Sequence, residues 1–368
     1  MLSLRNLLRR KTRTLLTVTG VAVGVSIVVC MTAISRGFRM QVNGMFAAGQ
    51  AHLILSRKDV ADPILSYLPM SLPADLRGRP DVADVQPVLF AAQQIPPLVV
   101  FIYFGTTPES PFLTQVKITE GEGLFDHPGE DRLIMGRSAA RRFGLELGGE
   151  FKIGKRTFRL VGLFESATPL IDSAAIMPLA AAQEAAGLED KLTIALVTLN
   201  DPTRESLVAS ELSIEEAHPD VQATVPGEWA SAFDEFDLAD QAATVFSLLA
   251  ICIGGISVMN TILMSVFERT REIGILRAVG WSKAMILREV IAESLLVALV
   301  GGPAGILLGV GVVEFIGTLD NFSWVAGDYG PRVFGEALVV AVGMGVVGAT
   351  YPAWRAVNIT PIEALRYE

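Results

Sequence analysis

At 368 residues the chain can form two or three folding units, and its charged fraction of 19% lies below the roughly 25% typical of soluble domains. Its net charge of −9 is divided unevenly: residues 37–240 hold 16 Lys/Arg against 29 Asp/Glu, whereas the rest of the chain holds 14 against 10. Part of the chain is therefore expected to lie in lipid, and the acidic balance of the other part argues against nucleic-acid binding, which requires a basic face.

The first predicted membrane span covers residues 14–36 and follows a basic segment, residues 1–13. Arginine and lysine are frequent in that segment: Arg5, Arg9, Arg10, Lys11 and Arg13. A signal peptide shares a basic start and an apolar stretch, but the uncharged run here covers 22 residues, Thr14 to Ser35, and no small-residue cleavage site followed by a break appears. Because such a run can cross about 30 Å of hydrocarbon, a retained span is favoured.

Residues 37–240 are predicted to form an extracytoplasmic α/β domain, inserted between the first and second spans. Alternating or β-branched runs indicate strands at 51–55, 85–89, 98–104, 151–153, 158–163 and 192–199. Helical patterns occupy 137–143 and 202–217, and the segment 132–149 followed by 150–164 suggests a helix and then a hairpin that turns near Gly154-Lys155. Recurring prolines predict connecting loops at 63–80 and 96–97.

Three more apolar runs predict spans at 241–267, 289–316 and 336–354, which makes a membrane α-helical protein with four transmembrane helices. Lys and Arg are frequent before the first span and in the segment 268–288, whereas the loop 317–335 holds only Arg332. By the positive-inside rule, both termini, including the tail 355–368, and the segment 268–288 are predicted to be cytoplasmic. Helical patterns at 36–46 and 228–240 suggest that the first two spans continue as stalk helices that carry the inserted domain.

Glycines recur at four-residue spacing in two spans: Gly20 and Gly24 in the first, then Gly301, Gly305 and Gly309 in the third. In lipid this spacing lets two helices approach closely, since no side chain separates the backbones. The alternative is that glycine is simply common in membrane helices. Glu293 and Glu314 lie near the two ends of the third span, where a structural role is favoured over a functional one.

The segment 268–280 mixes charged and apolar residues at helical spacing just inside the membrane. Ile273, Leu276 and Gly280 can face the membrane or a groove in a partner, with the charged side chains pointing away. Two interpretations remain open on the residues alone. One is an interfacial helix whose basic side chains reach the headgroups, and the other is a short cytoplasmic helix that docks into another protein.

The same segment resembles the signature of the FtsX/MacB-like permeases, the mechanotransmission (type VII) class of ABC transporters. The C-terminal residues 351–356 (YPAWRA) and 361–366 (PIEALR) resemble that family's ending, and residues 4–7 (LRNL) with 11–17 (KTRTLLT) resemble its N-terminal helix. Residues 37–240 match more loosely, at 134–137 (IMGR), 143–145 (FGL), 148–149 (GG) and 159–162 (RLVG). The resemblance thus covers nearly the whole chain, strongly in the membrane part and weakly in the inserted domain.

In that family the helix after the second span is the coupling helix, which seats in a groove of a cytoplasmic ATPase. The resemblance therefore implies these ATPase-coupling residues: Glu268, Arg269, Arg271, Glu272, Gly274, Arg277 and Gly280. It also implies two ABC ATPase subunits as partners, which would bind ATP and Mg²⁺, and a second permease copy as a homodimer or close paralogue. No catalytic residue, metal or cofactor is expected in this chain.

One segment mimics a nucleotide-binding loop. Gly149 to Lys155 fits G-x-x-x-x-G-K, but Arg156 stands where Ser or Thr would reach Mg²⁺, and no other Walker-type sequence is present. ATP is therefore expected on a separate polypeptide, unlike in family members with a fused N-terminal ATPase. Cys30 and Cys252 lie singly in apolar runs and the three histidines show no ligand spacing, so neither a metal site nor an enzymatic centre is predicted.

The leading interpretation is the permease of a transporter in the bacterial cytoplasmic (inner) membrane that exports or extracts a drug, peptide, lipid or lipoprotein. ATP-driven movements of the coupling helices would be carried to the inserted domain, without passage of the cargo through a membrane channel. The alternative is an FtsX-like signal-transmitting complex that regulates a cell-wall hydrolase. Membrane lipids are expected partners in both cases. The further partner would distinguish these functions. A periplasmic adaptor with an outer-membrane channel would indicate export, a lipoprotein would indicate extraction, and a cell-wall hydrolase would indicate regulation.

Overall fold

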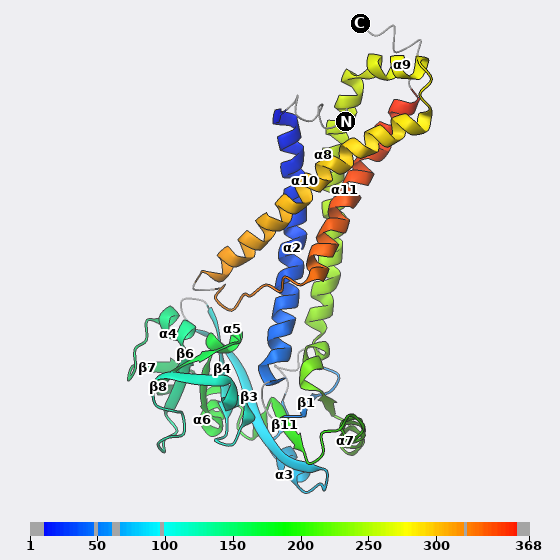
Figure 1. The fold of residues 1–368 in the computed structure, drawn as a ribbon. Coiled ribbons are helices and arrows are strands. Elements are labelled where there is room, and N and C mark those ends of the chain that lie inside the picture. The colour runs from blue at the N-terminus through cyan, green and yellow to red at the C-terminus, as the bar shows by residue number, and fades with distance from the viewer. Residues whose placement is uncertain (1–10, 48–50, 61–66, 96–98, 320–321, 359–368) are drawn as a thin grey trace. The chain divides into compact units, whose positions relative to one another are not determined.

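The structure, a computed structural model, describes residues 11–47, 51–60, 67–95, 99–319 and 322–358 (Figure 1). The chain divides into two compact units. The first, called the membrane unit below, comprises the chain up to Arg36, Ala239–Phe315 and the chain from Gly327 onward. The second, the inserted domain, comprises Gly37–Leu238 together with Ile316–Ala326.

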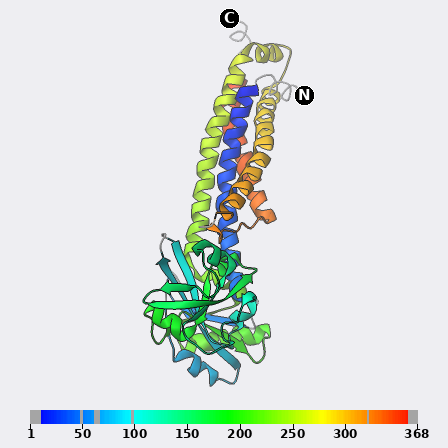
Figure 2. The same cartoon turned by 90° about the vertical axis from the view of Figure 1, so that its left-hand side faces the viewer.

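Four long helices build the membrane unit: α2 (Lys11–Ala47), α8 (Asp234–Glu268), α10 (Lys283–Gly317) and α11 (Pro331–Val357). Each contains a stretch long and apolar enough to cross a membrane, and within the described ranges these are the four helices that do, which confirms the predicted fold class. Figure 2 shows them running lengthwise beside one another. A short helix, α9 (Thr270–Ala278), connects α8 to α10.

Glycines of α10 allow it to touch the backbone of α2. A Cβ atom added at Gly305 would lie 2.6 Å from the carbonyl oxygen of Ala22 and 2.7 Å from the Cβ of Val25. Gly301 and Gly309, one turn away on either side, meet α2 at similarly short distances. Because real Cβ atoms do not approach backbone so closely, only glycine permits this spacing of the two helices.

The two glycines predicted in the first span also lie at contacts between helices of the same chain. A Cβ atom at Gly20 would lie 3.0 Å from the hydroxyl of Ser257 on α8, and one at Gly24 would lie 2.6 Å from the methyl group of Met344 on α11. All five glycines singled out from the sequence therefore serve packing within one protomer.

The predicted stalk extensions differ from each other. α2 continues without a break through residues 36–46, as the stalk hypothesis requires. Residues 228–240 are not one helix, however, because the 3-10 helix η3 (Pro226–Ala232) ends before Phe233 and α8 begins at Asp234. The break follows from burial: Trp229 is fully buried and packs edge-on against Phe233, with 4.9 Å between ring centroids, in a core of the inserted domain.

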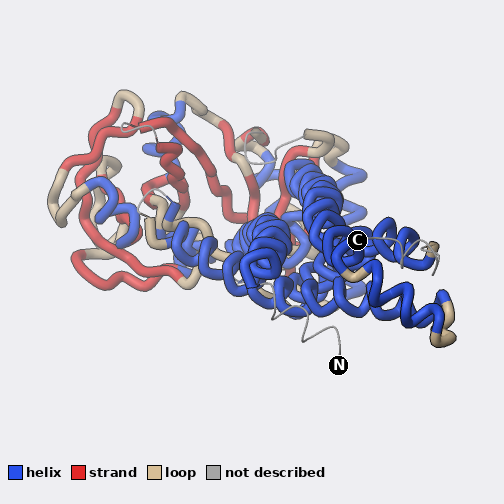
Figure 3. The backbone as a smooth tube through the Cα atoms, turned by 90° about the horizontal axis from the view of Figure 1, so that it is seen from above, coloured by secondary structure: helices blue, strands red, loops and turns tan. Residues whose placement is uncertain are grey.

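The inserted domain contains a ten-stranded mixed sheet, whose strands are red in Figure 3. The strands are β1 (Leu53–Arg57), β3 (Val82–Ile95), β4 (Val99–Thr106), β5 (Val116–Gly121), β6 (Arg132–Gly136), β7 (Glu150–Ile153), β8 (Arg156–Ser166), β9 (Ala175–Pro178), β11 (Ile194–Leu199) and β12 (Val221–Thr224). Their order is β12-β1-β11-β3-β4-β9-β6-β8-β5, with β7 paired to β8. β4 with β9 and β6 with β8 are parallel, and the other neighbours are antiparallel.

The long strand β3 joins two halves of this sheet. Its residues 82–88 pair with β11, and its residues 89–95 pair with β4. α3 (Leu72–Arg77) and α7 (Arg204–Ala217) contribute to the core of one half, and α4 (Arg137–Phe143) and α6 (Leu179–Ala186) to that of the other. A third core, around Phe104, includes η2 (Pro111–Gln115) and α5 (Pro169–Asp172). A separate two-stranded pair is formed by β2 (Leu68–Pro69) and β10 (Lys191–Leu192).

The six predicted strands and the helices predicted at 137–143 and 202–217 are confirmed, but the strand predicted at 85–89 extends over Val82–Ile95 and the one predicted at 192–199 is divided between β10 and β11. The β7–β8 hairpin turns at Gly154-Lys155 as expected. The predicted helix 132–149 is wrong at both ends: β6 occupies its start, between β8 and β9 with its apolar side chains buried, and α4 ends at Phe143, where Gly144 has a φ of 63°. Residues 63–80 hold β2 and α3 as well as loop, since Pro73 lies in the first turn of α3, where no hydrogen bond is lost. The loop predicted at 96–97 lies outside the described residues.

Candidate functional site

α9 is separated from α8 by one residue. Arg269 lies between the two helices with φ −109° and ψ 15°. The hydroxyl of Thr270 is bonded back to the carbonyl oxygens of Val266 and Phe267, at 3.2 and 2.8 Å, which satisfies acceptors at the end of α8. These bonds fix the point at which the chain leaves the direction of α8.

A second break separates α9 from α10. Gly280 has a φ of +105°, which glycine adopts at little cost. The hydroxyl of Ser282 then accepts a hydrogen bond from the amide of Met285 at 3.3 Å, and this capping bond explains why α10 begins at Lys283, six residues before the predicted membrane span 289–316. α9 is therefore an independent helix of nine residues.

The exposed face of α9 carries both charged and apolar side chains. Arg271 and Glu272 are exposed, and so are Ile275 and Val279, by 47% and 78%. Arg271, Ile275 and Val279 follow one another at four-residue spacing, so they lie on one side of this segment. Ile273 is buried on the opposite side, next to the buried Gly274.

Three of the predicted coupling residues bond to other helices of the membrane unit: Glu268, Arg269 and Arg277. Glu268 accepts two hydrogen bonds from the guanidinium of Arg13 on α2, at 3.1 and 3.2 Å. Arg277 donates to the carbonyl oxygen of Val357 at 2.8 Å, where its positive charge also complements the C-terminal end of α11. Glu268 and Arg277 therefore hold α8 and α9 to the neighbouring helices.

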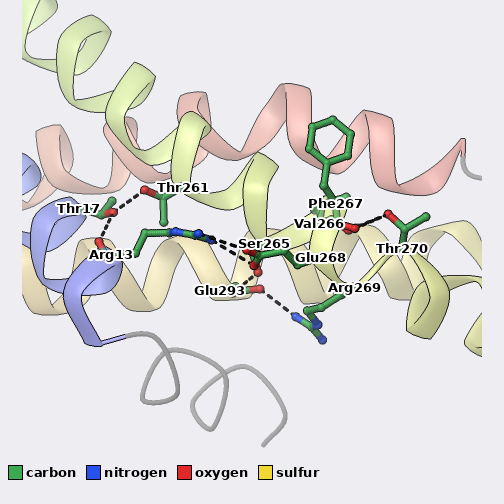
Figure 4. A network of polar contacts seen from close by, with 10 residues as sticks. All are labelled: Arg13, Thr17, Thr261, Ser265, Val266, Phe267, Glu268, Arg269, Thr270 and Glu293. Atoms are coloured by element: carbon green, nitrogen blue, oxygen red, sulfur yellow. Dashed lines mark hydrogen bonds and ion pairs between the residues drawn. The ribbon is translucent and has the colours of Figure 1, made fainter. Parts of the chain in front are cut away.

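Glu293 of α10 is the buried centre of the polar network in Figure 4. It is 6% exposed, and its carboxylate accepts from the hydroxyl of Ser265 on α8 at 3.0 Å and from the guanidinium of Arg269 at 3.2 Å. The same guanidinium donates to Glu272, on the exposed face of α9, at 3.3 Å. Arg269 thus links the exposed helix to a buried charge on α10. The sequence named both residues, but no spacing rule indicated that they meet.

The opposite end of the membrane unit has its own set of polar contacts. Arg36 of α2 pairs with Asp328 at 3.2 Å, and the amide of Asp328 donates to the carbonyl oxygen of Ala33 at 3.0 Å. The hydroxyl of Tyr329 donates to Glu314 of α10 at 2.8 Å. The residues that precede α11 are in this way held to α2 and α10.

The inserted domain offers no comparable chemical centre among its described residues, where no group of three His, Cys, Asp or Glu could hold a metal ion. The mimic of a nucleotide loop is the β7–β8 turn, in which a Cβ atom at Gly154 would lie 2.5 Å from the carbonyl oxygen of Ala185. His52, His127 and His218 lie on separate segments, and His52 accepts a backbone amide through Nδ1. The site with the most distinctive geometry is therefore α9 and its network.

Residues 244–361 match the family model described as FtsX-like permease C-terminal, and residues 14–214 match the MacB-like periplasmic core domain. The macrolide export ATP-binding/permease protein MacB of Nitrobacter winogradskyi is 29% identical over 385 residues, which cover 96% of this chain and 58% of that protein. The pyoverdine export ATP-binding/permease protein PvdT of Pseudomonas entomophila is 26% identical over 392 residues, or 97% and 57% of the two chains. An uncharacterized ABC transporter permease of Bacillus subtilis, YknZ, is 36% identical over 124 residues, or 33% and 30%.

Two solved structures are similar to about half of this chain. The periplasmic region of MacB from Actinobacillus actinomycetemcomitans has a TM-score of 0.38 at 11% identity and covers 50% of this chain and 94% of that one. The extracellular domain of YknZ has a TM-score of 0.36 at 13% identity, with 47% and 98% covered. The chain spans 58% or less of the length of the curated relatives named above.

Proposed function

The chain belongs to the family of ABC transporter permeases with an FtsX-like C-terminal region and a MacB-like periplasmic core domain, and from that membership we propose its role. It is the permease subunit of an ATP-driven complex in the bacterial cytoplasmic (inner) membrane, and a separate ATPase subunit binds ATP and Mg²⁺. Both termini and α9 lie in the cytoplasm, and the inserted domain lies on the other side. Two copies, or one copy and a close paralogue, bind two ATPase subunits.

The observation that carries this proposal is the exposed face of α9. Arg271 and Glu272 present opposite charges, and Ile275 and Val279 present apolar surface, on the face of α9 that the described residues leave exposed. A short helix with apolar anchors and flanking charges is suited to a groove in a partner protein. In this proposal that groove belongs to the ATPase.

The buried ion pair supports a route from α9 into the membrane unit. A displacement of α9 by the ATPase would pull on Arg269, and through Arg269 on Glu293 of α10. Because Glu293 is buried, its separation from Arg269 would leave a buried charge without its ionic partner, so the two helices move together rather than apart. Of the predicted coupling residues, Arg271 and Glu272 then bind the ATPase, whereas Glu268, Arg269 and Arg277 transmit.

For the cargo, we propose export or extraction of a drug, peptide, lipid or lipoprotein through movements of the inserted domain. Two relatives matched over nearly the whole of this chain are named for export, of macrolides and of pyoverdine. This favours export over the regulation of a cell-wall hydrolase.

The proposal is tested by recovering the ATPase with the full chain from membranes in mild detergent and measuring its activity with and without the permease. Recovery of a protein with Walker motifs is expected. The double substitution Arg271→Glu with Glu272→Arg should lower its recovery or its stimulation at least tenfold, because it inverts the charges that face the groove.

A matched control inverts two opposite charges elsewhere on the chain, again without changing net charge. Arg332 and Glu336 lie 2.9 Å apart on the first turns of α11, and Arg332→Glu with Glu336→Arg should leave ATPase recovery unchanged. Equal stimulation by the α9 variant and by this control would show that α9 is not the coupling helix. A co-purified adaptor would support export, and a co-purified cell-wall hydrolase would contradict it.

A further inference from the structure

α8 is the least enclosed of the four transmembrane helices. Inside the protomer 22% of its apolar window is buried, against 33%, 39% and 44% for α2, α10 and α11. Residues 241–267 carry no charge. Exposed side chains recur along it at spacings of three or four residues and so form one stripe, here called the α8 stripe: Val245, Leu249, Cys252, Ile256 and Asn260.

Asn260 differs from the other members of the α8 stripe because its side chain carries a carboxamide. Exposed threonines elsewhere on the spans, Thr19, Thr244 and Thr350, donate their hydroxyl hydrogen to a carbonyl of their own helix. The carboxamide of Asn260 has no hydrogen-bond partner in the part of the chain that the structure describes. It lies eight residues before Glu268, or about 12 Å along the helix, and therefore within the apolar stretch rather than at its end.

Lipid tails cannot satisfy this group. A carboxamide has two N–H donors and an acceptor oxygen, and hydrocarbon provides neither donor nor acceptor. The complement of a carboxamide is a second carboxamide, because each oxygen can accept from the other's nitrogen. A twofold axis between two copies of one helix brings identical residues together, so it supplies that complement at the same depth in the membrane.

We propose that the α8 stripe packs against the α8 stripe of a second copy of this chain, with the Asn260 carboxamides of the two copies hydrogen-bonded to each other. The inference rests on the two-copy assembly of the proposed function and assigns to it a surface and a residue. The apolar members of the stripe supply the packing. The single amide pair sets the register, since sliding the helices by one turn would leave both amides without partners.

Cys252 allows a direct test of the surface in native membranes. The chain has two cysteines, and Cys30→Ser removes the other, which is half-buried between helices. Oxidation with copper-phenanthroline should then form a disulfide-linked dimer through Cys252. The control carries Leu307→Cys on α10, which is 75% exposed, together with Cys30→Ser and Cys252→Ser. Cross-linking through Cys252 is expected to be at least fivefold faster than in this control.

Equal rates in the two variants would mean that cross-linking reports random collisions, and the α8 interface would be wrong. The α8 interface would also be wrong if the Cys30→Ser chain formed no disulfide-linked dimer while the purified complex contained two copies of the chain. If the purified complex contains one copy only, the two-copy assembly of the proposed function fails as well. Because none of these measurements uses ATPase activity, a failure of the coupling assignment at α9 does not affect them.

Asn260 is tested by substitution at constant size. Asn260→Leu should lower the association constant of the dimer in detergent about 3- to 20-fold, the range that interhelical hydrogen bonds give in membrane proteins. Asn260→Gln keeps the amide and should recover most of the loss. An unchanged constant for Asn260→Leu would show that the amide does not bind across the interface, and a tighter dimer would exclude the pair altogether.

Discussion

The membrane unit and the inserted domain reach close packing by opposite means. In the membrane unit, glycines such as Gly305 bring one backbone against another, whereas in the inserted domain large rings such as Phe104 fill the space between sheet and helices. The reason is the solvent. Lipid tails are as apolar as leucine, so burial of a large side chain gains little in the membrane and close contact is what stabilises helix pairs. In water the burial of each ring is itself a major stabilising term.

The largest effect is expected where a side chain is added at a contact between backbones. Gly305→Leu would place four carbons where the Ala22 carbonyl and the Val25 side chain already leave no room, so α10 could not approach α2. We expect this variant to fail to form the bundle, measured as loss of the monodisperse peak in size-exclusion chromatography in mild detergent. Gly311→Leu, on the same helix, meets nothing within 4 Å and should behave like the parent. Equal behaviour of the two variants would refute the packing argument.

The next effect is expected where a side chain is removed from the inserted domain. Phe104 is fully buried, with ring centroids 5.0 Å from Phe90 and 4.7 Å from Phe112. Phe104→Ala should cost about 3–5 kcal/mol of unfolding free energy in this domain, from lost burial and the cavity left behind. Hydrogen exchange of the β3 amides measures it. Val100→Ala on the same strand, 57% exposed, should change exchange by no more than about 0.5 kcal/mol.

A smaller effect is expected at the buried charge of the membrane unit. Glu293→Ala removes the buried partner of Arg269 and of the Ser265 hydroxyl; because Arg269 keeps its contact to Glu272, we expect a loss of about 1–3 kcal/mol. Thermal unfolding in detergent measures it. Glu272→Ala disrupts the exposed contact of the same arginine and should cost under about 1 kcal/mol. If both variants lose the same stability, burial of Glu293 does not govern the pair.

The smallest effect concerns pH. Two hydrogen bonds from Arg79, at 3.1 Å each, hold the pKa of Asp81 below its ordinary value. A lowered pKa in the folded state adds stability above the unfolded pKa of about 3.9, and that stability is lost as the pH falls through the folded value. Asp81→Asn should therefore remove under about 1 kcal/mol at neutral pH and nothing at the acid end. The measurement is hydrogen exchange near β3 between neutral and acid pH, and a difference that grows on acidification would contradict the sign.

The membrane unit and the inserted domain also differ in how far they could be predicted from the sequence. The four spans could be predicted because an uncharged run of membrane length has few alternative explanations. The helical residues of α10 before the predicted span lie in a charged segment, where the Ser282 cap is only a local signal. In the inserted domain, β6 was taken for the start of a helix, since a short apolar run such as Leu133–Met135 shows no period that separates strand from helix. The order of ten strands depends on long-range pairing, which no local pattern encodes.

The resemblance located the candidate site, but it did not show which of its residues face a partner and which bond to other helices of the chain. The segment 268–280 was named, yet Ile275 and Val279 were not, although their four-residue spacing from Arg271 was visible in the sequence. The hydrogen bonds that Arg269 and Arg277 donate could not be predicted from the sequence, because the acceptors, on Glu293 and Val357, lie in other helices. Which charges of an amphipathic helix face a partner depends on tertiary contacts that spacing leaves open.

The side chain of Met344 on α11 makes a more flexible contact between helices than the backbone contact at Gly305. A Cβ atom at Gly24 of α2 or at Gly254 of α8 would lie about as close to its thioether as the Gly305 position lies to the α2 backbone. The thioether, however, has rotatable bonds and adapts to irregular space, whereas a carbonyl oxygen in a helix does not. Shear of α11 against α2 is therefore absorbed at this point by rotation of one side chain, while shear of α10 along α2, or of α11 along α8 where a Cβ atom at Gly348 would lie 2.6 Å from the carbonyl oxygen of Gly255, would force two backbones apart. The bundle has a stiff direction and a compliant one.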